Sequence, residues 1–296
     1  MKTDCRRRGA WSVERGAWSV ERGTGIRTSA AFTMIEIAIS LAIIGFALVA
    51  IIGVLPIGMN AQKENREETI INQEATVLMD AIRSGAQGLD DLANYVVAIT
   101  NDVYEYTYPY TKPPAHVGTY GYTNSISSIF PLTNGYRIVG LLSTPKYVPY
   151  TDKIGSGYYS NNVVAYLRSM SGPAYEKFPQ ANPDVKDFAF SYRMTSEVIP
   201  YGAAGTNYHY YDPSWTSDTN YAAVVNNLSN NLHDVRLTFR WPLRSQGQLG
   251  TGGQAFRTLA GGFLQEVNEL AFPRPNTNVP SAYDLYFFQP RTYVKP

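Results

Sequence analysis

The sequence predicts an α+β protein, in which one long N-terminal helix packs on an antiparallel β-sheet. Two observations predict this fold class. An uncharged apolar run covers residues 37–59 and continues into a polar segment with helical periodicity. Beyond residue 95, short apolar or alternating runs are separated by segments rich in Gly, Pro and Asn. Strands and helices do not alternate along this part, so we expect the sheet to be antiparallel.

The long helix is expected over residues 33–84. Its apolar run of 23 residues would span roughly 34 Å, enough to cross a bilayer core. After residue 60 the segment is polar, but four apolar residues recur at helical spacing: Ile71, Ala75, Leu78 and Ile82. Gly85 and Gly88 supply stop signals. Pro56 lacks a backbone donor, so we expect a kink or local melting at 53–56.

The remaining chain is expected to form strands joined by long connections. The clearest strands are 185–195 and 235–241, in which apolar and polar residues alternate. Shorter strands are predicted at 95–100, 136–142, 163–169, 255–260 and 282–288. Residues 245–253 contain four Gly and are expected to form a hairpin loop. Residues 107–128 and 201–230 are predicted to be long connections, either solvated loops or binding loops.

Charge around the apolar run predicts its orientation. Residues 1–31 carry seven basic and three acidic side chains, a net of +4, whereas the charges just after residue 59 are mixed. Excess Lys and Arg hold their side of a membrane segment in the cytoplasm, so everything after residue 59 is expected to be exported. A secretory signal peptide has a shorter apolar region, with small residues after it. Here the small residues 29–31 come before the apolar run. An uncleaved signal anchor remains an alternative.

The composition excludes several kinds of site. After the leader is removed, 18 basic and 21 acidic side chains remain, which gives no basic footprint for nucleic acid. The only cysteine, Cys5, lies in the leader, so the exported part has no thiolate metal site. The three histidines, His116, His209 and His233, lack metal-binding spacing, and the glycines at 250–253 lack the Lys of a phosphate loop. We therefore expect neither an enzyme nor a bound cofactor.

One carboxylate stands at the head of the apolar run. Ala31 is followed by Phe32-Thr33-Met34-Ile35-Glu36, and then by the uncharged segment. A charge inside a membrane segment costs about 2.5–3.5 kcal/mol and usually marks a functional residue with a partner. The arrangement of basic leader, small residue, Phe-Thr-x-Ile-Glu and apolar helix closely resembles the N-terminus of type IV prepilins and type II secretion pseudopilins. This chain departs from the family at Ala31, where Gly is usual, and in a long leader with a tandem Gly-Ala-Trp-Ser-Val-Glu-Arg repeat.

The resemblance implies how the chain is processed and assembled. A prepilin peptidase would cut between Ala31 and Phe32, and Phe32 would then be N-methylated. Glu36 would direct assembly by pairing with the amino group of a neighbouring subunit. The chain would then have four parts: a cleaved leader (1–31), a membrane and assembly helix (32–59), an amphipathic continuation (60–88) and an exported β-rich domain (89–296). The implied partners are the peptidase and methyltransferase, other pilin or pseudopilin subunits, an inner-membrane assembly platform and lipid.

The length of the mature chain and its long loops favour a minor or tip-located subunit over the bulk component of a fibre. The alternative is a binding module or adhesin that uses the helix only as a mount and its Tyr-rich segments, 104–122 and 201–221, as contacts. Some major pseudopilins bind calcium in a loop. Residues 212–220 offer candidate ligands in Asp212, Asp218 and Asn220, but they lack the ordered spacing of a calcium loop and also suit a plain turn.

Overall fold

The computed structural model describes residues 32–107, 113–125, 130–151, 156–171, 190–201, 219–244, 247–268 and 284–294. The chain divides into two compact units, Met1–Met59 and Asn60–Pro296. The predicted leader, including Ala31, lies outside the described residues.

Helix α1 (Met34–Ser84) confirms the predicted long helix and its end. All of its residues are helical, so the local melting expected at 53–56 does not occur. Pro56 removes only one backbone donor, and the residues on either side of it are helical. The helix ends in a Schellman motif, in which Gly85 N–H bonds Ile82 O and Ala86 N–H bonds Ala81 O. Gly85 has φ +60°, the left-handed conformation that this motif requires.

The strands form one large antiparallel sheet and a small one. The large sheet has the order β2 (Ala115–Thr123), β1 (Val96–Thr107), β4 (Ser156–Arg168), β5 (Ser191–Pro200), β6 (Leu232–Leu243), β7 (Leu249–Gly261), and β3 (Tyr147–Thr151) also pairs with β4. The small sheet pairs β8 (Phe263–Asn268) with β9 (Asp284–Gln289). Shorter helices are η1 (Asp90–Asn94), α2 (Gly135–Leu142) and α5 (Thr219–Asn231).

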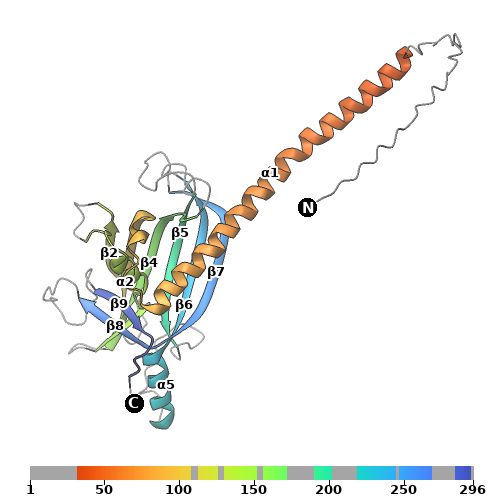
Figure 1. Cartoon of the computed structure of the whole chain (residues 1–296). Coiled ribbons are helices and arrows are strands. Elements are labelled where there is room, and N and C mark those ends of the chain that lie inside the picture. Colours follow the sequence, from red (N-terminus) through yellow and green to blue (C-terminus); the bar gives the residue numbers. More distant parts are fainter. Residues whose placement is uncertain are drawn as a thin grey trace, which may run out of the picture. The chain divides into compact units, whose positions relative to one another are not determined.

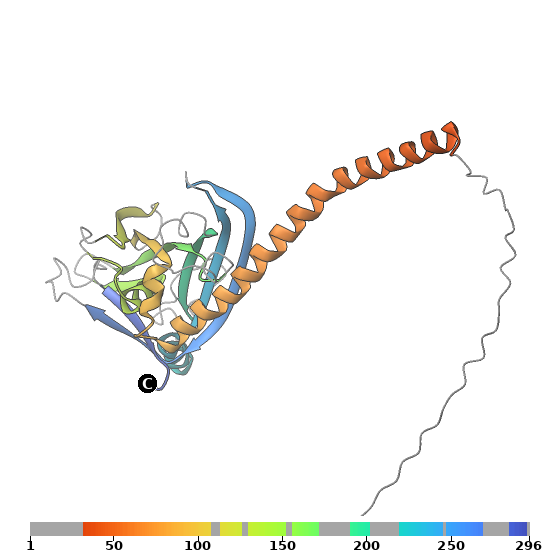
Figure 2. The same cartoon turned by 45° about the horizontal axis from the view of Figure 1, so that its top comes forward.

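The core lies between the sheet and the helices, which confirms the α+β prediction. Residues 60–84 of α1 run along one face of the large sheet (Figures 1 and 2). Ile71, Leu78 and Ile82 of this part of α1 are fully buried. They belong to one hydrophobic cluster with inward-facing strand residues such as Met194 and Leu237. Helix α2 and strand β9 complete the same cluster, through residues such as Ile138 and Phe287.

The strand predicted at 136–142 is wrong, because these residues form helix α2. The side chain of Asn134 accepts a 3.0 Å hydrogen bond from Arg137 N–H and so caps the helix. The β-branched residues in this segment suit a strand, but tertiary packing outweighs that preference. A Cβ on Gly140 would lie 2.8 Å from the ring of Phe287, so α2 and β9 pack closely at this glycine.

The predicted hairpin exists, but its glycines lie elsewhere than expected. Gly250, Gly252 and Gly253 are in strand β7, and the turn is closed by Arg244 and Gln248. A Cβ on Gly252 would lie 2.5 Å from the indole nitrogen of Trp241 on β6. Glycine therefore marks a close approach between strands here.

The other predicted strands are confirmed, most of them with longer bounds. The strand expected at 185–195 corresponds to β5, and residues 185–189 lie outside the described part. The prediction of long connections at 107–128 and 201–230 is wrong for the residues that form β2 and helix α5. Accordingly, Tyr104 and Tyr122 of the proposed Tyr-rich contact segment lie in the paired strands β1 and β2.

Candidate functional site

The first candidate site is the apolar surface of α1. Every residue from 32 to 59 is exposed in the isolated chain, including Phe46 at 80 %. Removing one such Leu, Ile or Phe side chain from water is favourable by about 1.5–3 kcal/mol. The helix is long and apolar enough to cross a membrane. Burying a surface of this kind in lipid or against other apolar helices would therefore be strongly favourable.

The head of this helix is organised by Thr33 and Glu36. Glu36 Oε2 accepts hydrogen bonds from the backbone N–H and the hydroxyl of Thr33, each at 2.8 Å. In return, Glu36 N–H donates to Thr33 Oγ1 at 3.4 Å. This reciprocal arrangement is a capping box, which satisfies N–H groups that a helix start leaves free. The carboxylate thus has a partner within its own chain, a role that sequence reasoning missed.

The structure brings only part of the predicted motif together. Phe32 lies one residue before the capping box and is 82 % exposed. Met34 and Ile35 come next, on the exposed helix surface. Ala31, on the other side of the expected cleavage bond, lies outside the described residues.

Sequence reasoning also missed Glu74, a buried carboxylate in the second half of α1. Its Oε1 accepts from Met170 N–H at 2.7 Å and Ser171 N–H at 3.2 Å, and its Oε2 accepts from the Tyr192 hydroxyl at 2.6 Å. Burial raises the pKa of Glu74, and these bonds oppose that rise. Glu74 lies next to Ala75 on the apolar face of the helix. A charged residue at a position of this kind is the sequence signal that could have identified it. With every oxygen occupied, this side chain fastens α1 to the sheet.

The predicted metal candidates are not brought together in the described part of the chain. Asp212 and Asp218 lie outside it, as does the side chain of Asn220, whose backbone lies in the first turn of helix α5. The described residues contain no group of three His, Cys, Asp or Glu side chains that could hold a metal ion.

The histidines have separate surroundings. His116 contacts Tyr104 edge-to-face and lies 3.2 Å from the hydroxyl of Thr119. His233 is buried against Phe288, and burial lowers its pKa to about 4. His209 lies outside the described residues.

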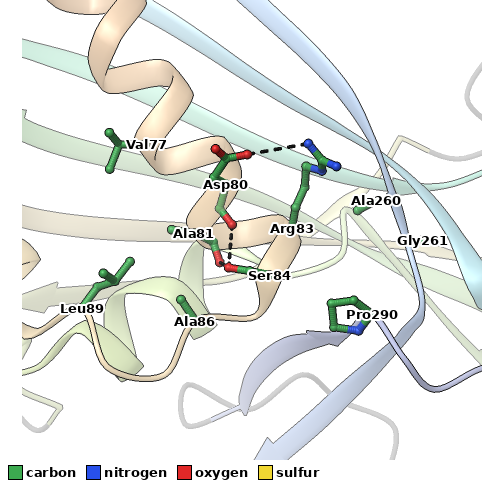
Figure 3. A pocket seen from close by; sticks show the side chains of 10 residues that line it. All are labelled: Val77, Asp80, Ala81, Arg83, Ser84, Ala86, Leu89, Ala260, Gly261 and Pro290. Atoms are coloured by element: carbon green, nitrogen blue, oxygen red, sulfur yellow. Dashed lines mark hydrogen bonds and ion pairs between the residues drawn. The ribbon is translucent and has the colours of Figure 1, made fainter.

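An open hollow of ≈ 670 Å³ lies beside the end of α1 (Figure 3). Its lining combines the helix residues Val77 and Ala81 with Ala260 of β7 and Pro290. The two charged side chains among its described lining residues, Asp80 and Arg83, form an ion pair at 3.6 Å. The described part of the lining therefore presents a largely apolar surface.

Comparison with known proteins identifies no relative: no protein-family model, no curated protein and no solved structure matches this chain.

Proposed function

We propose that this chain is a pilin-like structural subunit, processed by a prepilin peptidase and assembled into a type II secretion pseudopilus or a type IV pilus-like fibre. The observation that carries the proposal is the exposed apolar helix at 32–59 with a single carboxylate, Glu36, at its head. A membrane stores such a helix in the precursor. A bundle of like helices buries it in the fibre.

The arrangement of the helix head fits this cycle. Cleavage before Phe32 creates a free amino group one residue from the capping box. In the single subunit, the Glu36 carboxylate is occupied by Thr33. During assembly, the amino group of a neighbouring Phe32 would join or replace these donors, because opposite charges attract strongly where water is excluded. Glu36 then selects one register between adjacent helices.

The same proposal gives the location and partners. The precursor spans the cytoplasmic membrane once, with its N-terminus inside and residues 60–296 exported. It meets the peptidase and methyltransferase in the membrane, then an assembly platform and other subunits. The length of the mature chain favours a minor subunit. Recovery of this chain as the bulk of purified fibres would contradict that placement.

The test is the intact mass of the native protein, combined with two variants. The expected mature chain begins at a methylated Phe32. Glu36→Val should be cleaved normally but should not enter fibres. Ser40→Ala is the matched control, because it removes a hydroxyl one turn further along the same helix, where Ser40 bonds Glu36 O, and it should assemble normally. A native protein that still begins at Met1 would indicate a signal anchor and refute the proposal.

A further inference from the structure

Three arginines on the outer face of the large sheet have no anionic partner among the residues that the structure describes. We refer to Arg168, Arg193 and Arg240 as the arginine face. Arg193 of β5 is directly opposite Arg240 of β6. Arg193 is also opposite Tyr166 of β4, which places Arg168 diagonally next to it. Like charges directly opposite on neighbouring strands destabilise a sheet, so this arrangement calls for a compensating anion.

The side chains of the arginine face point away from α1. Tyr192 faces α1, because its hydroxyl bonds Glu74 of that helix. Successive residues of a strand point to opposite faces, so Arg193 points outward. Its Nε is buried without a hydrogen-bond partner. A Cβ on Gly253 would lie 3.1 Å from Cδ of Arg240, so this glycine leaves room for that arginine to lie across the sheet.

The acidic residues that β5 and β6 place on this face are already paired. Asp234 binds both Arg236 and Arg257, and Glu197 pairs with Lys146. In contrast, the arginine face makes no ion pair within the described part of the chain. The described residues of this chain therefore leave the arginine face open to an anion from another molecule.

The composition of the face favours a protein carboxylate as that anion. All three cations are Arg, which is enriched at protein interfaces and matches carboxylates with two parallel hydrogen bonds. Next to them lies a neutral row that includes Val164, Thr195 and Thr238. Phosphate polymers are usually held by more contacts, commonly six to ten in strong binders.

The chain itself carries the complementary carboxylates. Glu64 and Glu68 lie on α1 before its first buried residue, Ile71. Both are exposed, and neither forms an ion pair in the part of the protein that the structure describes. They are one helical turn apart, so their Cβ atoms are about 6 Å apart on one side of the helix. Arg66 is two positions from each and points elsewhere.

These carboxylates line an open groove on the α1 side of the sheet. The groove, of ≈ 360 Å³, is also lined by Trp241 and Gly252. Beside them, Glu67 is partly buried and paired with Lys63 at 3.8 Å. Glu64 and Glu68 are therefore the uncompensated charges among the described lining residues of the groove.

We propose that Glu64 and Glu68 of one copy bind the arginine face of a second copy. The Cβ atoms of Arg193 and Arg240, opposite each other on adjacent strands, are about 5 Å apart, close to the spacing of the two glutamates. The two surfaces belong to opposite faces of the sheet, so the contact is heterologous. Such a contact adds copies head to tail without closing. The inference rests on the proposed fibre function. The contact can join a short run of copies as well as a long one.

Site-specific cross-linking tests the contact directly. Cys5 is the only cysteine, so a full-length Cys5→Ser chain provides a clean background. Cells would co-express one chain with Glu68→Cys and another with Arg240→Cys, and membranes would be treated with a short bismaleimide. We expect a cross-linked pair of copies. Val117→Cys is the matched control, because it is exposed on the far edge strand β2 and should give at least tenfold less product.

Charge exchange separates loss of contact from loss of folding. The variant pairs Glu64→Arg with Glu68→Arg, and Arg193→Glu with Arg240→Glu, should each reduce cross-linking at neighbouring cysteines about tenfold. A chain with all four changes should recover it. Recovery cannot come from a misfolded protein, and its failure would refute the contact.

Two further outcomes keep this inference distinct from the proposed function. Normal cleavage and fibres without cross-linking would overturn the contact and leave the fibre function standing. Cross-linking of uncleaved precursors, with no fibre, would support the contact and refute the fibre function. Loss of binding to a heparin column in Arg193→Glu/Arg240→Glu, without cross-linking in the parent, would assign the face to a polyanion instead and overturn the proposal.

Discussion

The hydroxyl of Tyr192 donates a 2.6 Å hydrogen bond to Oε2 of Glu74, joining strand β5 to helix α1 across 118 residues of sequence. Both side chains are buried, at 0 % and 2 % exposed. Burial and the adjacent carboxylate hold the pKa of Tyr192 well above its usual value, so the phenol keeps its proton and remains a donor. Together with Met170 and Ser171, Tyr192 holds the helix in one position on the sheet.

Glu74→Ala should destabilise the exported domain strongly. It leaves the partly buried N–H of Met170 and the buried hydroxyl of Tyr192 without their acceptor, at a cost of about 1–3 kcal/mol for each group. We therefore expect the free energy of unfolding, measured by urea titration of the full chain in detergent, to fall by about 3 kcal/mol or more. Asp80→Ala is the matched control, because Asp80 is an exposed carboxylate on the same helix. Equal effects of the two changes would contradict this account.

Acid should destabilise the domain through His233. Burial lowers its pKa to about 4, against about 6.5 in an unfolded chain. As the pH falls from 6.5 towards 4, His233 becomes protonated in the unfolded chain but stays neutral in the folded one. The free energy of unfolding therefore falls by up to about 3 kcal/mol. His233→Leu should remove this loss. His116→Leu, at an exposed histidine, should keep it.

Glu74 should oppose this acid effect. Its pKa is raised above 4.5 in the folded state, so the folded chain takes up a proton first as the pH falls, which increases stability in that range. Glu74→Gln removes the titrating group. The variant should therefore lose stability more steeply than the parent between pH 6.5 and 4, in urea titrations at several pH values. An unchanged or shallower slope would contradict the raised pKa.

Gly85→Ala should disrupt the end of α1. Gly85 has φ +60°, and a Cβ there would lie 2.1 Å from the carbonyl oxygen of Phe288. The residue would be strained and would also clash with β9, so we expect a loss on the order of 2–3 kcal/mol in the free energy of unfolding. Gly88→Ala, where a Cβ meets nothing within 4 Å, is the control and should change stability little. Chemical denaturation of both variants measures the difference in their free energy of unfolding, and equal values would contradict this prediction.

Thr33→Val should separate the capping role of Glu36 from its assembly role. The change removes the hydroxyl that Glu36 accepts from but keeps the charge of Glu36 and the N–H of residue 33. If assembly depends on the charge, fibres should form at a yield within about twofold of the parent, because a capping residue contributes only about 1 kcal/mol. Thr33→Ser should match the parent. Loss of fibres as complete as in Glu36→Val would show that the cap itself is required.

Regular patterns made the long helix and most strands predictable. The stripe at Ile71, Leu78 and Ile82 and the alternation in β5 and β6 each extend over several residues, so single exceptions do not obscure them. Helix α2 is only eight residues long, and its β-branched Ile138 and Val139 suit a strand equally well. Its identity depends on the Asn134 cap and on contact with β9, which lies about 145 residues later.

The residues of the candidate sites also differ in whether the sequence alone predicts their roles. The sequence Thr33-x-x-Glu36 is a capping-box motif that can be recognised without knowledge of the fold. The position of Glu36 at the head of an apolar run favours an assembly role instead. Glu74 resembles any polar helix residue until the fold brings Met170, Ser171 and Tyr192 to it. The arginine face likewise exists only through the register of β4, β5 and β6. Long-range pairing of this kind leaves no local trace.

Strand β9 is the last described part of the hydrophobic core to be synthesised. Its residues Leu285, Phe287 and Phe288 are almost wholly buried and lie in the core beside α2 and α1. They are synthesised after every other described core residue, so the face of α2 that packs on β9 stays uncovered until the last few dozen residues have been made. A chain that stalls or is clipped before residue 284 should therefore fail as a whole domain, and should be recognised by proteases as unfinished.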